Sequence, residues 1–89
     1  MYQKKTKIKN SLGIHARPAS MIVKLASKFE SKVELEKDNI DVNAKSIMGV
    51  LMLASEKGQE IVVRACGEDE KEAVKAVVEL IGKRKFDEE

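Results

Sequence analysis

The strand-like segments of this chain alternate apolar with polar side chains, and this alternation limits the folds open to it. Ile61, Val63 and Ala65 lie at every second position and would share one face of a strand. The same period of two recurs in residues 2–10, 31–37 and 40–43. The last two segments flank Asp38-Asn39, a pair typical of a hairpin turn. Because strands buried on both faces are continuously apolar, we expect a sheet with one face open to water.

Three other segments have the period of a helix, with apolar residues three or four positions apart. They are residues 16–29, the short apolar run 46–55 and residues 68–85. Asp69 and Glu72 have the spacing of a capping box at the start of the last one. The order β-α-β-β-α-β-α predicts an α+β open-faced sandwich, with a four-stranded antiparallel sheet and three helices on one face.

Length and composition favour a single domain, residues 1–89, that stays in the cytoplasm. A chain of 89 residues has room for one core, and its single cysteine, Cys66, cannot close an internal disulfide. We expect Cys66 to be a small buried strand residue. No apolar run is long enough for a signal sequence or a membrane span. The net charge is only +2 with basic and acidic residues interleaved, so we expect neither nucleic acid nor membrane as a partner.

The most distinctive stretch is "GIHARPAS", Gly13 to Ser20, which contains the only histidine and the only proline of the chain. Pro18 is tolerated only near a helix start, so it places His15 at or beside the N-cap. The unpaired N–H groups and the dipole of a helix start attract anions and disfavour an imidazolium. We therefore expect a neutral His15 ring that can attack a phosphoryl group.

A phosphoryl group on His15 would be stabilised by the unpaired backbone N–H groups of the helix start and by the Arg17 guanidinium. The residues nearby in sequence include no positioned general base for water, which favours a carrier over a hydrolase. These residues alone also permit His15 to be an ordinary surface or capping residue. No metal site is expected, because there is no second histidine and the cysteine is remote in sequence.

Together, "GIHARPAS" and "AKSIMGVLML" resemble the HPr family, the histidine-containing phosphocarriers of the bacterial phosphoenolpyruvate-dependent sugar phosphotransferase system. The resemblance covers nearly the whole chain. It implies a carrier that is not itself an enzyme and needs no cofactor. Nδ1 of His15 would accept a phosphoryl group from enzyme I and pass it to enzyme IIA domains of sugar permeases. Ala16 and Arg17 would bind the phosphoryl group.

The resemblance also implies a second modification site at Ser46. A serine at this position is phosphorylated by an ATP-dependent HPr kinase/phosphorylase in Gram-positive relatives, and the product partners a catabolite-repression transcription factor. From the residues alone, Ser46 is first an N-cap of the short helix that follows. A phosphate there would keep the favourable helix dipole and would therefore change partners rather than fold.

A two-turn helix cannot bury all the apolar residues that follow Ser46, so some should form a docking patch. The resemblance assigns Ile47, Met48 and Leu51 to that patch, beside Ser20 and Lys24 of the first helix. The patch is modest and suits transient docking, so we expect a monomer. Leu12, Ser27 and Ala54 depart from the family pattern. The terminal "FDEE", residues 86–89, should be frayed.

Two other functions compete with the phosphocarrier. One is a regulatory binding module that works through Ser46 with a vestigial His15. The other is a small acyl-phosphate hydrolase in which Arg17 binds phosphate, although it lacks a residue that positions water.

Overall fold

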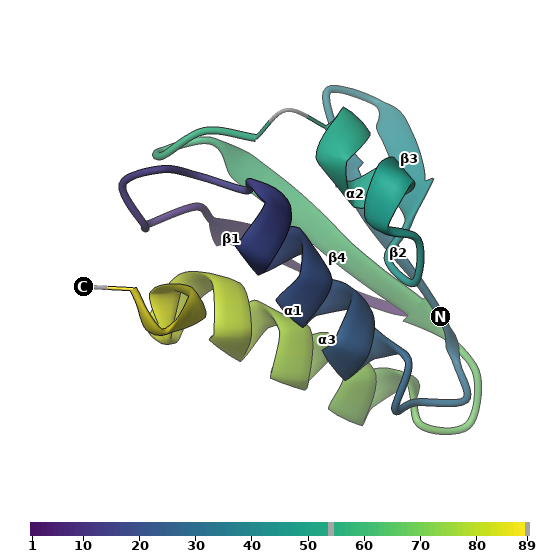
Figure 1. Cartoon of the computed structure of the whole chain (residues 1–89). Helices are drawn as coiled ribbons and strands as arrows, with labels where there is room; N and C mark the ends of the chain where they lie inside the picture. Colours follow the sequence, from purple (N-terminus) through teal and green to yellow (C-terminus); the bar gives the residue numbers. More distant parts are fainter. Residues whose placement is uncertain (54, 89) are drawn as a thin grey trace.

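The computed structural model describes residues 1–53 and 55–88 and shows a four-stranded sheet covered on one face by helices (Figure 1). The elements are β1 Tyr2–Lys7, α1 Ala16–Ala26, β2 Lys32–Lys37, β3 Ile40–Asn43, α2 Ile47–Met52, β4 Glu60–Cys66 and α3 Glu70–Val78. A π-helical turn, η1 Glu79–Lys83, and a short turn, η2 Lys85–Asp87, follow α3. The strands are antiparallel in the order β1-β4-β2-β3. The expected α+β open-faced sandwich is confirmed.

The hairpin between β2 and β3 forms at the predicted pair. Asp38 and Asn39 have φ values of 53° and 67°, the left-handed conformation that the tightest hairpin turns require at both central positions. The turn pairs Lys37 with Ile40 and so sets the register of the two strands. This register places Val42 beside Leu35, on the half-buried side of the edge strand.

The alternating residues divide between a dry face and a wet face of the sheet. Val33, Leu35, Ile61 and Val63 are fully buried against the helices. On the other face, Arg64 of β4 joins all four strands. Its guanidinium lies 2.8 Å from Gln3 Oε1 of β1, 2.6 Å from Glu36 Oε1 of β2 and 3.0 Å from Asp41 Oδ1 of β3. The open face is therefore held together by hydrogen bonds and ion pairs rather than by apolar packing.

The capping box expected at Asp69 is wrong. Asp69 is the N-cap residue of α3, but its side chain makes no cap hydrogen bond. Its carboxylate instead accepts hydrogen bonds from the backbone N–H groups of Glu30 (2.9 Å) and Ser31 (3.0 Å) and from the Ser31 hydroxyl. These bonds lower the pKa of the Asp69 carboxyl, the largest effect coming from the Ser31 hydroxyl. Asp69 thus ties the connection before β2 to the start of α3, a long-range contact that the local pattern could not reveal.

Cys66 is exposed, so its expected burial is also wrong. The strand alternation explains the difference, because Ala65 faces the core and the next residue must then face away from it.

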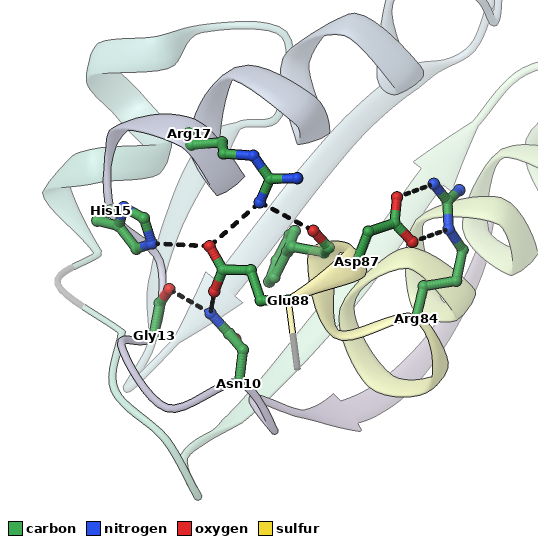
Figure 2. A network of polar contacts seen from close by, with 8 residues as sticks. Asn10, Gly13, His15, Arg17, Arg84, Asp87 and Glu88 are labelled. Atoms are coloured by element: carbon green, nitrogen blue, oxygen red, sulfur yellow. Dashed lines mark hydrogen bonds and ion pairs between the residues drawn. The ribbon is translucent and has the colours of Figure 1, made fainter.

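Residues 86–88 fold back onto the domain, contrary to the expected fraying, and residue 89 lies outside the described residues. Lys85, Phe86 and Asp87 all have positive φ values, a left-handed turn that costs about 1–2 kcal/mol for each residue. Phe86 is fully buried, which contributes about 1.5–3 kcal/mol and offsets much of that cost. Arg84 also pairs with Asp87 at 2.7 Å. The turn brings Glu88 to the start of α1 (Figure 2).

We expect Asp69→Asn to lower the free energy of unfolding at neutral pH and to flatten its fall in acid. The folded-state pKa of Asp69 lies below its unfolded value of about 3.9. The stabilisation is therefore complete above about pH 4 and is lost as the pH falls through the folded-state pKa. Urea unfolding from pH 7 to pH 2 measures both effects. Glu68→Gln is the control, and an acid limb for Asp69→Asn as steep as that of the parent would contradict the assignment.

Candidate functional site

The histidine lies at the start of α1, as predicted. His15 is the N-cap residue, with extended backbone angles (φ −112°, ψ −164°), and no side chain caps the helix. Gly13 precedes it with φ +69°, and a Cβ at this position would overlap the carbonyl oxygen of Ser55. The backbone N–H of Ile14 donates to the same Ser55 carbonyl at 3.0 Å. The loop that carries His15 is therefore packed directly against the connection that follows α2.

A carboxylate from the other end of the chain joins the site (Figure 2). Glu88 Oε2 lies 3.2 Å from Nε2 of His15 and 3.1 Å from a terminal nitrogen of Arg17. Sequence reasoning missed Glu88 because it considered only the neighbours of His15 along the chain. The buried Phe86 was the one signal in "FDEE" that could have marked the segment as anchored. The sequence neighbours of His15 include no carboxylate, and only the fold brings Glu88 to the ring.

Asn10 holds this carboxylate from its other side. Its Nδ2 donates to Glu88 Oε1 at 2.9 Å and to the Gly13 carbonyl at 2.8 Å. Asn10 is fully buried, and its hydrogen bond is the largest of the effects that lower the pKa of the Glu88 carboxyl, followed by the contact with His15. Glu88 therefore remains ionised at neutral pH, accepts hydrogen bonds from Asn10 and Arg17, and lies within hydrogen-bond distance of the His15 ring.

Arg17 lies next to His15 but stays open to solvent. One of its terminal nitrogens donates to the Phe86 carbonyl at 3.0 Å as well as to Glu88. The side chains of His15 and Arg17 are 38% and 52% exposed, so both can be reached by a partner protein. The structure brings these two predicted residues together through Glu88. Ala16 lies between them in the sequence and is the first residue of α1. It is also exposed.

Ser46 is the N-cap of α2, as expected. Its Oγ accepts a hydrogen bond from the backbone N–H of Gly49 at 3.1 Å. The short helix leaves four residues exposed, which we call the apolar patch: Ile47, Met48, Leu51 and Met52, exposed by 45%, 71%, 36% and 75%. Only Val50 of this helix is buried. A small apolar surface thus lies immediately beside the Ser46 hydroxyl.

The first-helix residues assigned to docking lie on a neighbouring element. Helix α1 packs against α2, with Ser20 half-buried and Lys24 exposed. Of the departures from the family pattern, Leu12 is 75% exposed and Ser27 is an exposed residue at the end of α1. Ala54 lies outside the described residues. Over residues 1–53 and 55–88, no helix combines the length and the apolar character that crossing a bilayer requires.

Comparison with known proteins identifies the family. The family model of the PTS HPr component phosphorylation site matches residues 2–83. Phosphocarrier protein HPr of Treponema pallidum is 46% identical over 89 residues, 100% of both chains. The crystal structure of HPr from Thermoanaerobacter tengcongensis has a TM-score of 0.94 and 50% identity, over 100% of this chain and 99% of that one.

Crh of Bacillus subtilis, solved as a dimer with a swapped domain, has a TM-score of 0.74 and 44% identity, over 91% of this chain and 93% of that one. Two kinds of comparison therefore agree, since the match in sequence spans the same residues as the match in fold. The chain belongs to the HPr family, the phosphocarriers of the phosphotransferase system.

Proposed function

We propose that Nδ1 of His15 is the atom that carries the phosphoryl group. The contact between Nε2 and Glu88 supports this assignment. If Nε2 bears the ring proton and donates it to the carboxylate, the lone pair lies on Nδ1. That lone pair attacks phosphorus, an N–P bond forms, and the bond from phosphorus to the donor breaks. The positive charge that develops on the ring lies beside an ionised carboxylate, which stabilises it.

The phosphoryl oxygens would be held by the start of α1 and by Arg17. The N–H groups of Ala16 and Arg17 belong to the first turn, and Pro18 has none, so two amides are available for an anion. Arg17 is bound to Glu88 and to the Phe86 carbonyl through one nitrogen, which leaves the rest of its guanidinium for the phosphoryl group. A dianion on His15 would compete with Glu88 for Arg17.

The same contacts favour a carrier over a hydrolase. A hydrolase needs a base that takes a proton from water. Glu88 is the carboxylate nearest to His15 among the described contacts, but Asn10 and Arg17 already donate to it and its pKa is lowered, which makes it a weak base. We infer that Glu88 orients the ring and does not activate water, so this protein is not itself an enzyme.

The donor and acceptors follow from the family. We propose that enzyme I phosphorylates His15 and that enzyme IIA domains of sugar permeases receive the group. Both would dock on the apolar patch together with Ser20 and Lys24, because an exposed apolar centre with a basic edge suits an acidic partner. We further propose that the whole chain, 1–89, is one cytoplasmic domain that acts as a monomer, although Crh forms a dimer.

Ser46 is proposed as a regulatory site, phosphorylated by an HPr kinase/phosphorylase and then recognised by a catabolite-repression transcription factor. Its hydroxyl is partly exposed and lies beside the apolar patch. A phosphate there adds almost two negative charges at the edge of a surface that partners must desolvate. Phosphorylation of Ser46 would therefore weaken the docking that phosphoryl transfer to His15 requires.

Incubation with enzyme I and phosphoenolpyruvate, followed by intact mass, tests the His15 assignment. We expect one phosphate that is lost in acid and is absent from His15→Ala. Ser46→Ala is the matched control and should label normally. A folded protein that acquires no phosphate, or one whose His15→Ala variant still labels, would show that the carrier assignment is wrong.

Glu88→Gln should slow phosphorylation by enzyme I about tenfold, because a glutamine NH₂ can donate to Nε2 and favour the tautomer with the proton on Nδ1. Rates of phosphohistidine formation and ¹⁵N shifts of the ring nitrogens measure the two effects. Glu72→Gln removes the same charge at an exposed position of α3, and it should change neither. An unchanged tautomer in Glu88→Gln would refute the role given to this carboxylate.

Ser46→Asp should weaken binding to enzyme I about tenfold, a change of about 1.4 kcal/mol. Ser46→Asn is the neutral control, since asparagine also caps a helix but adds no charge. Titration calorimetry gives the dissociation constants of both variants. Melting temperatures equal to that of the parent would show that both side chains still cap α2. Equal affinities for the two variants would exclude charge as the regulatory signal.

A further inference from the structure

A cleft at the end of the sheet is lined by five lysines from separate segments and by none of the candidate-site residues. They lie at and just after the end of β1, in the turn before β4, at the end of η1 and at the start of η2: Lys7, Lys9, Lys57, Lys83 and Lys85. The cleft has a volume of about 630 Å³. This is within the range of small-molecule sites, about 300–1,000 Å³. We call it the lysine cleft.

The charged residues that line the lysine cleft are all positive. No carboxylate lines it, and none of its lysines forms an ion pair within residues 1–53 and 55–88. The whole chain has a net charge of only +2, so the fold concentrates in one place a charge that the sequence disperses. Lysines that are interleaved with acidic residues along the sequence are thus gathered at this cleft. A cleft lined by one sign of charge focuses its field and attracts the opposite sign.

Backbone contacts join three of the segments that line this cleft. The backbone N–H of Ile8 donates to the Gln59 carbonyl at 2.9 Å, and that of Gly58 donates to the Ile8 carbonyl at 2.8 Å. Gly82 packs so closely on β1 that a Cβ there would lie 2.5 Å from Oγ1 of Thr6. These contacts join the turn, the strand and η1 into one frame. The free-energy cost of ordering the backbone of these segments on binding would therefore be small.

We propose that the lysine cleft binds a compact anion that carries two or more phosphate groups. Ammonium groups bind phosphate as point charges, and lysines spread around an opening of this volume are too dispersed for one phosphate to engage them all. Two or more linked phosphates can. The apolar lysine stems between the charges suit the part of the ligand that joins its phosphates.

A small ligand is favoured over nucleic acid by the lining of the cleft. Proteins that bind single strands stack bases on aromatic side chains within a basic groove. No aromatic residue lines the lysine cleft, whose other members are Ile8, Gly58 and Gly82. The inference is independent of phosphorylation at His15, because none of the proposed phosphoryl-binding residues lines this cleft.

A ¹⁵N NMR titration of the full chain with inorganic tripolyphosphate, pyrophosphate, orthophosphate and sulfate, at constant ionic strength, tests the proposal. We expect affinity to rise with the number of linked phosphates, and shifts to centre on the amides of residues 7–9, 57–58 and 83–85. Lys57→Gln/Lys83→Gln should weaken tripolyphosphate binding about tenfold or more. Both side chains are exposed, so the fold should survive, and the remaining amide spectrum checks this.

Lys32→Gln/Lys71→Gln is the matched control, because it removes the same charge at exposed positions outside the cleft and should bind as the parent does. Equal loss in both double variants would reduce the effect to net charge and overturn the proposal. So would equal affinity for orthophosphate and tripolyphosphate, or shifts centred on residues 15–17. A short single-stranded oligonucleotide that binds the same amides more tightly than tripolyphosphate would show that the cleft takes nucleic acid instead.

Discussion

The carboxylate of Glu88 is the contact on which the geometry of the candidate site depends. It binds an amide from the loop before α1, the ring of His15 and the guanidinium of Arg17, and so connects the two ends of the chain. None of these three partners is placed by its own segment alone. The ring nitrogen that faces solvent, and with it the chemistry of the site, depends on which nitrogen this carboxylate holds.

Glu88 reaches that position because Phe86 is buried. The aromatic ring anchors a turn whose left-handed backbone is unfavourable for three successive side chains. The strain of three such residues, about 3–6 kcal/mol, exceeds what the burial of Phe86 contributes, so this segment should open more easily than the sheet. A partner that approaches His15 can therefore displace the carboxylate from Arg17 without disturbing the core. The site thus places a carboxylate with three polar contacts on a strained carboxyl-terminal turn.

Much of this structure could be predicted from the sequence, because most elements carry a local signal. Alternation marked the strands, Asp38-Asn39 marked the hairpin, and Pro18 with Ser46 marked two helix starts. The failures were contacts between distant segments. Asp69 has the local pattern of a helix cap, but its carboxylate accepts a hydrogen bond from Ser31 instead. Glu88 belongs to an acidic tail in which no local pattern indicates its contact with His15. The lysine cleft collects side chains that are dispersed along the chain, and only the fold brings them together.

The tail also determines where anything attached to this protein would emerge. Residue 88 lies against the imidazole, whereas the amino group of Met1 pairs with Glu70 at 3.3 Å, at the far end of α3 (Figure 1). A label or fusion partner joined at the carboxyl end would crowd the docking side and pull on the ring's only carboxylate contact among the described residues. The same cargo joined at the amino end would leave the imidazole unobstructed, so the two ends are not equivalent as points of attachment.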